Sequence, residues 1–144
     1  MPIWVRVRIR RSGGLGEVET SAKVNTGFTI GPYPLIRLPR PLAEKLGFDV
    51  ERAEVLMGVV DAGGRPLPMR RLGVVEVKAV APDRETGWVK AMAVFTGGSS
   101  TLLNDVLTER LNIVLERPGS GMWRFADEPP TRLRESAEEE YWGE

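Results

Sequence analysis

Short stretches of alternating apolar and polar residues, separated by turns rich in glycine and proline, constrain the fold of this chain most strongly. In residues 3–10 every second residue is isoleucine or valine, and Trp4 or an arginine stands between them. The same period of two returns from Glu17 to Val24. Period two predicts strands with one buried and one solvated face, so we expect a first hairpin with Trp4 and the arginines on its outer face.

The rest of the chain repeats this pattern of short strands. The segment after Thr29 holds two prolines and is expected to re-enter the sheet near Leu35. Further strands are predicted at Val55–Val60, Leu67–Val80, Trp88–Phe95, Asn112–Leu115 and Met122–Phe125. Two short helices are expected, one from Pro41 to Gly47 and one capped by Thr101 and containing Leu103, Val106, Leu107 and Arg110. The pattern indicates a mostly β fold, a barrel or a sandwich, with two short helices.

Domain organisation follows from length and from a change in composition near the end. A chain of 144 residues suits one domain with a real core. We assign the domain to residues 1–126 and an acidic C-terminal tail to residues 127–144, after which point the strand periodicity is lost. The tail is expected to be weakly helical from Arg132 to Tyr141. We expect the acidic side chains of the tail to pair with the arginines of the first strand, either in the same chain or in a second chain.

Composition excludes several classes of site. The chain has no cysteine and no histidine, which removes disulfides, thiolate metal sites and histidine-assisted nucleophilic catalysis. We therefore expect no metal and no cofactor. The formal net charge is zero, so we expect neither nucleic acid nor a membrane as partner. There is no signal-peptide pattern and no membrane-spanning run, and a cytoplasmic protein is expected. Abundant arginine and glutamate without glutamine suggest a thermophilic source.

One turn has the form of a chemical site without its reactive group. Strand-like residues up to Val24 run into Asn25-Thr26-Gly27, and asparagine and glycine tolerate the positive φ of a turn that lifts a side chain from a sheet. Asn25 has no titratable carboxyl group. The alternative is a purely structural turn residue held by backbone hydrogen bonds; the order of motifs described next favours a former catalytic position over this alternative.

The order of four motifs resembles that of the single-domain retropepsin-like aspartic proteases, from about Val5 to Phe125. Val24-Asn25-Thr26-Gly27 stands where that family has Asp-Thr-Gly, and Leu38-Pro39 with the following helix is similar to the family's next element. Residues 59–66 resemble the flap hairpin. Residues 93–95 and 102–113 resemble the second apolar motif and its helix. The resemblance implies a barrel of the retropepsin-like acid protease type.

The resemblance also implies a mechanism and a partner. In this family two chains each supply one aspartate, so the site exists only in the homodimer, and the two carboxyl groups share one proton and activate a water. For this chain it implies a homodimer across the Asn25-Thr26-Gly27 turn. Thr26 would hydrogen-bond across the axis. An extended peptide would lie between the flaps and contact Phe28 and the flap residues Asp61, Ala62, Gly63 and Gly64.

The sequence departs from the family where catalysis would occur. Asn25 replaces the aspartate, Phe28 replaces a small residue, and about five extra residues lie around residues 30–34. Asn104 replaces a glycine, a change that we interpret as mild because asparagine tolerates a left-handed backbone. For Asp61 two interpretations stay open: a residue at the tip of a flap over the cleft, or an ordinary hairpin aspartate. Asp105 is expected to act structurally near a helix N-terminus.

Three hypotheses follow. The first is a catalytically silent homodimer of this fold that serves as a peptide-binding or scaffold module. The second is an active aspartic endopeptidase represented here by an Asp-to-Asn inactivated variant. The third is an unrelated small β-barrel interaction domain that assembles through its basic first strand and acidic tail.

Overall fold

The computed structural model describes residues 2–14, 16–24, 31–61 and 63–143. Its strands are β1 (Trp4–Arg11), β2 (Glu17–Val24), β3 (Leu35–Arg37), β4 (Glu54–Leu56), β5 (Met69–Ala79), β6 (Val89–Phe95), β7 (Thr101–Leu103), β8 (Ile113–Arg117), β9 (Met122–Phe125) and β10 (Arg134–Glu135). Its helices are α1 (Arg40–Lys45), α2 (Asp105–Arg110) and the 3-10 turn η1 (Val50–Arg52). No helix within these ranges is long and apolar enough to cross a bilayer.

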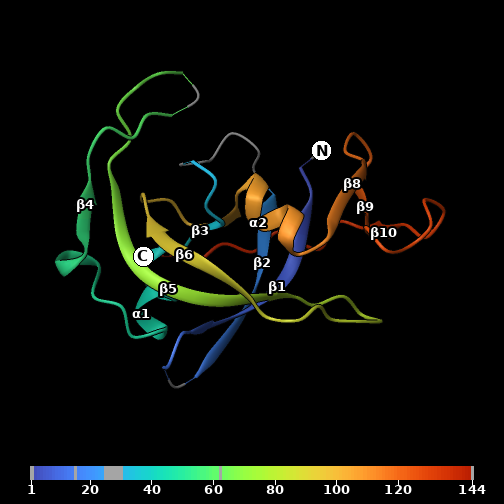
Figure 1. The fold of residues 1–144 in the computed structure, drawn as a ribbon, viewed down its shortest axis with the longest axis horizontal. Coiled ribbons are helices and arrows are strands. Elements are labelled where there is room, and N and C mark those ends of the chain that lie inside the picture. Colours follow the sequence, from blue (N-terminus) through green and yellow to red (C-terminus); the bar gives the residue numbers. More distant parts are fainter. Residues whose placement is uncertain (1, 15, 25–30, 62, 144) are drawn as a thin grey trace.

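Six strands close into a barrel, as Figure 1 shows. Neighbours follow the order β1-β2-β7-β3-β6-β5, and β5 pairs back onto β1, while β4 extends the sheet beyond β5. The pairs β2–β7 and β3–β6 are parallel, and the others in the ring are antiparallel. Strands β8, β9 and β10 form a separate small sheet. The expectation of a mostly β, closed barrel with two short helices is confirmed.

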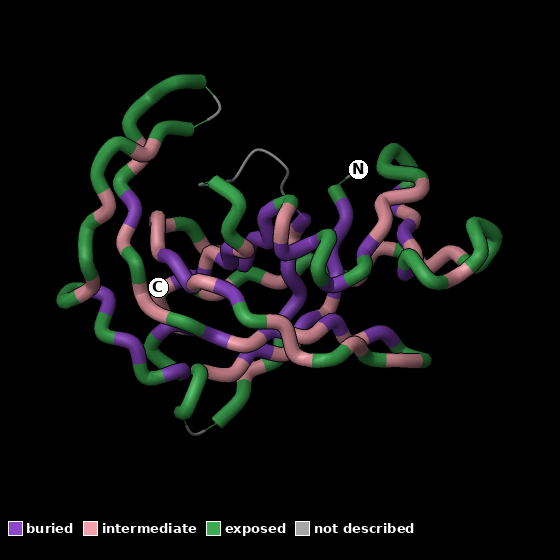
Figure 2. The backbone as a smooth tube through the Cα atoms, viewed as in Figure 1, coloured by how far each residue is buried: buried purple, intermediate pink, exposed green. Residues whose placement is uncertain are grey.

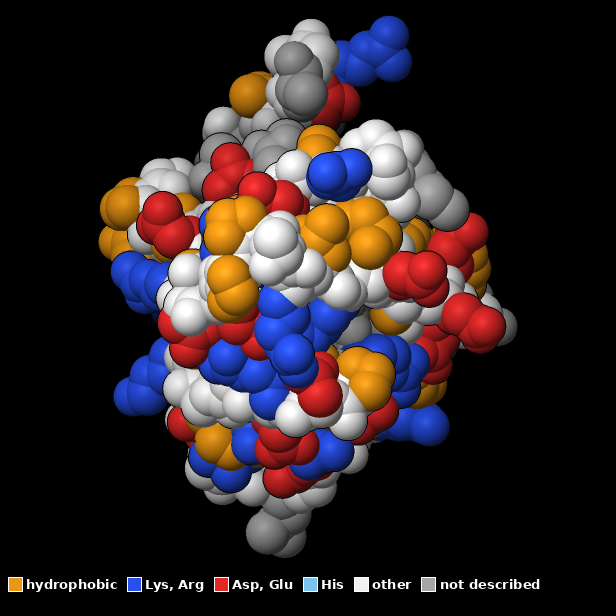
Figure 3. Space-filling view, turned by 90° about the vertical axis from the view of Figure 1, so that its right-hand side faces the viewer, with side chains coloured by type: hydrophobic (Ala, Val, Ile, Leu, Met, Phe, Trp, Pro, Cys, Tyr) orange, Lys and Arg blue, Asp and Glu red, His pale blue; other side chains and the backbone are white. Residues whose placement is uncertain are grey.

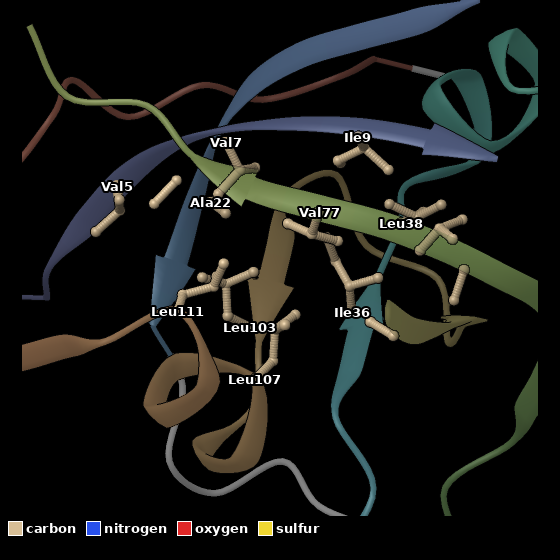
Figure 4. Packing of buried hydrophobic residues seen from close by; sticks show 14 of the residues in the cluster. Val5, Val7, Ile9, Ala22, Ile36, Leu38, Val77, Leu103, Leu107 and Leu111 are labelled. Atoms are coloured by element: carbon tan, nitrogen blue, oxygen red, sulfur yellow. The ribbon is translucent and has the colours of Figure 1, made fainter. Parts of the chain in front are cut away.

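Apolar residues of the alternating strands fill the barrel. Val5, Val7 and Ile9 of β1 are fully buried, and Ile36 and Leu103 reach the same core from β3 and β7. Leu107 of α2 and its neighbour Leu111 close one end of this core, as the close-up in Figure 4 shows. In Figure 2 the buried residues gather in the middle of the molecule, and the loops around it are exposed. Burial of this face explains why period two dominates the sequence.

Some predicted boundaries are wrong. The strand expected at Val55–Val60 ends at Leu56, and only an isolated bridge between Val60 and Pro66 continues the pairing. Thr101 was expected to cap a helix, but it begins β7. Residues 101–103 are buried. They pair with β2, and Leu102 and Leu103 also pair with β3, which a helix could not do.

The C-terminal segment is extended and packed against the barrel rather than helical. Residues 134–135 pair with β9, and no helix occurs in residues 132–141. The backbone N–H of Ala137 donates to the Trp4 carbonyl at 2.7 Å, and the Tyr141 ring lies edge-on to Trp4 at 5.6 Å. Trp4 is therefore 2% exposed, and its expected place on a solvated face is wrong. Backbone groups of this segment form hydrogen bonds with the edge of β9 and with the start of β1, instead of with one another as they would in a helix.

Among the described residues of this segment, five charged ones form ion pairs within the chain: Asp127, Glu128, Arg132, Arg134 and Glu140. Arg6 of β1 contacts Glu140 at 2.6 Å, as expected for the tail acids, while Arg8 and Arg10 pair with glutamates of the barrel itself. Arg134 contacts Glu128 and Asp83. On the side of the molecule that carries β8–β10, basic and acidic side chains lie side by side (Figure 3). These contacts hold residues 127–143 against the barrel. The boundary at residue 126 stays a prediction.

Candidate functional site

The centre of the predicted site lies outside the described residues. This applies to Asn25, Thr26, Gly27 and Phe28, and to Ala62 of the flap. The strand that leads to them is well defined, since Val24 pairs in parallel with Leu103 of β7 and its N–H donates to the Ile3 carbonyl at 2.9 Å. The Asn-Thr-Gly sequence therefore begins directly where β2 leaves the barrel.

The hairpin of residues 57–68 projects from the barrel between β4 and β5, at the top left of Figure 1. Asp61 shapes its end, because its Oδ1 accepts hydrogen bonds from the N–H groups of Gly63 at 2.9 Å and Arg65 at 3.0 Å. Gly64 has a positive φ of 79°, which a turn at this point requires. The hydrogen bonds to Asp61 are those of an ordinary turn residue, and they are compatible with either role left open for Asp61. Its place in a substrate site stays a prediction.

A pocket lies at the base of this hairpin. Its volume is about 300 Å³, and it is lined by Tyr33, Leu35, Leu56, Arg71, Met92 and Val94. A second, smaller apolar cluster of Leu35, Met69, Val94 and Leu102 forms its surroundings, and Val59 and Leu67 of the hairpin pack against that cluster. Apolar side chains remain exposed nearby, with Met57 at 88% and Tyr33 at 63%. A concave, mainly apolar pocket beside exposed apolar residues suits an organic ligand or a peptide side chain.

Asn104 fixes one wall of this region and has a different role from the expected one. Its φ is −81°, so it is not left-handed, and the expected reason for asparagine here is wrong. Its fully buried side-chain oxygen accepts from the N–H groups of Leu35 and Leu107, both at 2.9 Å. Its amide nitrogen donates to the Tyr33 carbonyl at 2.8 Å. Asn104 thus caps α2 and joins it to the start of β3.

Two arginines of the pocket-bearing face were missed in the sequence. Arg37 ends β3, is half-buried, and donates to the carbonyl and hydroxyl of Ser100, with Nη2 at 2.8 Å from each. Its burial, with no carboxylate beside it, lowers its pKa from the ordinary value. Arg71 belongs to β5 and lines the pocket. The signal was available, because Arg37 interrupts the apolar run from Leu35 to Leu38.

The described residues offer no cluster of carboxylates able to hold a metal ion. Asp105 is exposed in the first turn of α2, where the helix dipole favours its charge. The strongest acid–base interactions lie far from the pocket, at Arg134, Glu128 and Asp83. The hydrogen bond from Arg134 lowers the pKa of Glu128 to about 2 and that of Asp83 below its usual range. These groups hold the tail rather than a ligand.

No protein-family model matches this chain, and no curated protein matches it. Solved structures do. The retroviral protease-like domain of Ddi1 from Leishmania major aligns with a TM-score of 0.53 and 14% identity, over 92% of this chain and 98% of that chain. The fold is retropepsin-like. A retropepsin-like aspartic protease from Rickettsia conorii aligns with a TM-score of 0.44 and 19% identity, over 76% of this chain and 71% of that chain.

At this identity the likeness to the Ddi1 domain establishes the fold, and it covers the chain almost end to end. The sequence-based assignment to a retropepsin-like barrel is confirmed. The assignment of residues 59–66 to a flap stays a prediction.

Proposed function

We propose that this chain is a catalytically silent homodimer of the retropepsin-like fold that binds an extended peptide in its cleft. One observation carries the proposal: within this fold, the residue that directly follows β2 is Asn25, where the sequence resemblance places the catalytic aspartate. The neighbouring Phe28 and the inserted residues around 30–34 point in the same direction, because one substitution alone would leave the floor of the site intact.

The chemistry of an amide explains the proposed silence. A carboxylate can take a proton from water near neutral pH, but an amide cannot. Two symmetry-related copies of Asn25 leave neither a base nor an acid in the dyad. General acid–base assistance is typically worth ~10²–10⁴-fold in rate, and here both partners of the reaction are missing.

Peptide binding is supported by the surface that remains. The pocket of about 300 Å³ is mainly apolar and open to solvent, and Met57, which follows the pocket residue Leu56, is exposed. Val60 is a further exposed apolar residue of the hairpin. An extended peptide can add main-chain hydrogen bonds to an exposed strand edge while its alternate side chains enter pockets. The proposed module is therefore a binding or scaffold domain made of residues 1–126, with residues 127–144 as an attached segment. We extend the proposal to a thermophilic, cytoplasmic origin on composition alone.

The test is a proteolysis assay on the purified protein. A fluorogenic unfolded protein substrate is incubated with it at several pH values from acid to neutral, with inhibitors of contaminating serine, cysteine and metalloproteases present. We expect no hydrolysis above the buffer rate. Hydrolysis that co-purifies with the chain at any of these pH values would contradict the proposal.

A second candidate function is an active endopeptidase whose aspartate has been replaced by Asn25. The retained barrel, hairpin and pocket favour it, because an inactivated variant keeps its frame. The codon for residue 25 in the native gene decides between the two. An asparagine codon removes this candidate, and an aspartate codon removes the first. The third hypothesis, an unrelated β-barrel, fits the retropepsin-like fold poorly, and a dimer axis away from residues 25–27 would be needed to support it.

A further inference from the structure

We infer that the cleft selects peptides that carry an acidic side chain beside an apolar one, and that Arg37 and Arg71 recognise the acid. The inference rests on the proposed peptide-binding function and names the class of peptide. It follows from the register of three strands, from the lack of a carboxylate partner for either guanidinium group among the described residues, and from the pocket that Arg71 lines.

The strand register places both arginines on the face that bears the pocket. Val94 of β6 is the cross-strand partner of Arg71 on β5 and also of Arg37 on β3. Directly paired residues of neighbouring strands project from the same face of a sheet. Val94 and Arg71 line the pocket, so Arg37 lies on the same face, on the other side of Val94. β6 lies between β3 and β5, and neighbouring strands are ~4.8 Å apart, so the backbones of Arg37 and Arg71 are about 10 Å apart. Two long side chains that lean toward each other can reach one carboxylate held above Val94.

Neither guanidinium has a carboxylate partner among the described residues. Arg37 uses its Nε and Nη2 on Ser100 alone. Arg71 takes part in none of the ion pairs or side-chain hydrogen bonds found in the described ranges, although Glu54 of β4 stands opposite it in register. Three arginines of β1, Arg6, Arg8 and Arg10, each contact a glutamate, while the fourth, Arg11, donates to the Gly47 carbonyl. Arginines are usually paired when half-buried, and Arg37 is not.

Arg37 is also held in place. A Cβ added at Gly98 would lie 3.1 Å from Nη2 of Arg37, and Gly98 has a positive φ of 84°. The loop therefore comes close to the guanidinium and supports it through the Ser100 carbonyl at 2.8 Å. A guanidinium fixed in this way loses less rotational freedom when it binds a carboxylate in a forked geometry.

The pocket and the two charges together define the ligand. The walls formed by Leu35, Leu56 and Met92 suit an apolar side chain. In an extended peptide the side chains of residues i and i+2 share a face and stand ~6.6 Å apart. A peptide that places a leucine in the pocket therefore brings the side chain two positions away toward Arg71 or Arg37. An acidic side chain at that position can form an ion pair with Arg71 or bridge both guanidinium groups, which balances one of their two positive charges.

The experiment compares three fluorescein-labelled decapeptides that differ at one position. Each has a central leucine, and the residue two positions later is glutamate, glutamine or lysine. Binding is measured by fluorescence anisotropy with the full chain, with Arg71→Gln, and with Arg52→Gln as the matched control. Arg52 is a solvent-exposed arginine of η1. Charge-assisted hydrogen bonds are stronger than neutral ones, so we expect the glutamate peptide to bind about tenfold more tightly than the glutamine peptide.

Each outcome has a distinct meaning. The inference is supported if glutamate is preferred, if the preference falls in Arg71→Gln and with added salt, and if Arg52→Gln retains it. Equal binding of the three peptides overturns the acidic preference but leaves peptide binding intact. A preference that survives both Arg71→Gln and a second variant, Arg37→Met, overturns the assignment of these residues. Binding of no peptide overturns the proposed function and this inference together.

Discussion

At the scale of single residues, Asn104 contributes most to the shape of the candidate site. Its carboxamide uses three hydrogen-bonding positions, accepting from Leu35 and Leu107 and donating to Tyr33, and the residue is fully buried. One side chain thus joins the start of α2 to the start of β3, the strand whose residue Leu35 lines the pocket. Alanine would leave the two N–H groups and the carbonyl without these partners.

We predict that Asn104→Ala lowers the free energy of unfolding by about 2–4 kcal/mol, through loss of a helix cap and of buried hydrogen bonds. Urea denaturation followed by circular dichroism measures the change. Asn112→Gly is the matched control, because Asn112 follows the same helix and has a positive φ of 60°, which glycine adopts without strain. We expect that variant to change stability by less than about 1 kcal/mol. Similar losses in both variants would refute the role given to Asn104.

At the residue scale, the sequence identified which residues matter better than it identified what each of them does. The resemblance singled out Asn104, but a left-handed glycine replacement was the wrong explanation, because the partners Leu35 and Tyr33 lie about seventy residues away in the chain. Trp4 was misplaced for the same reason. Alternation predicts which face of β1 points inward, and it carries no information about a distant segment that covers the outer face.

At the scale of elements, the C-terminal segment shows what local pattern omits. The strands with clear alternation were predicted well, and β2 and β9 have the predicted bounds. Residues 127–143 have no periodicity, yet they are held by Trp142, whose Nε1 donates to Thr20 at 2.9 Å, and by ion pairs of Arg134. The position of these residues depends on contacts with side chains of the barrel surface, and composition alone does not reveal such contacts.

The ion pairs of this segment predict loss of stability in acid. The pKa of Glu128 is lowered to about 2 from 4.5, and that of Asp83 is also lowered, mainly by hydrogen bonds from Arg134. A carboxylate with a depressed pKa stabilises the fold fully above its unfolded-state pKa, and this contribution is lost as the pH falls through the folded-state value. We therefore expect the melting temperature to fall as the pH is lowered from about 4.5 toward 2.

The measurement is thermal unfolding at pH values from 7 to 2.5 for the full chain, Arg134→Met and Arg117→Met. Arg134→Met should melt at a lower temperature at pH 7 and show a shallower fall in acid, because its carboxylates have lost their main partner. Arg117, an exposed residue of β8, serves as the control and should leave the profile unchanged. Parallel profiles for all three proteins would show that the Arg134 network does not hold the segment.

At the scale of the whole molecule, the barrel is a frame that retains its topology while its proposed catalytic position holds an amide. The ring of six strands and the likeness to the Ddi1 domain establish this frame. The sequence could predict it because four motifs occur in the right order. The sequence marks Arg37 as a charge inside an apolar run. It could not predict the pocket, or that Arg37 and Arg71 share a face, because these arise from strands that meet only in the folded barrel.

Restoring the acid tests whether the remodelling goes beyond one residue. We predict that Asn25→Asp does not create measurable peptidase activity, because the proposed remodelling also replaces a small residue by Phe28 and adds residues around 30–34. The double variant Asn25→Asp with Phe28→Ala is the companion test. The assay uses a fluorogenic peptide between pH 3 and 7, with a pepstatin-like inhibitor as control. Inhibitable activity in the single variant would show that the asparagine alone silences the site.

The central claim is that two chains meet at the Asn25-Thr26-Gly27 turn, and one measurement tests it directly. The chain has no cysteine, so Asn25→Cys introduces a single thiol. A disulfide requires Cα atoms no more than about 7 Å apart. Under a mild oxidant, the proposed dimer should convert Asn25→Cys almost completely to a covalent dimer, while the surface control Arg52→Cys should stay largely monomeric on a non-reducing gel. If Asn25→Cys cross-links no faster than Arg52→Cys, the two turns do not meet and the proposed site does not exist.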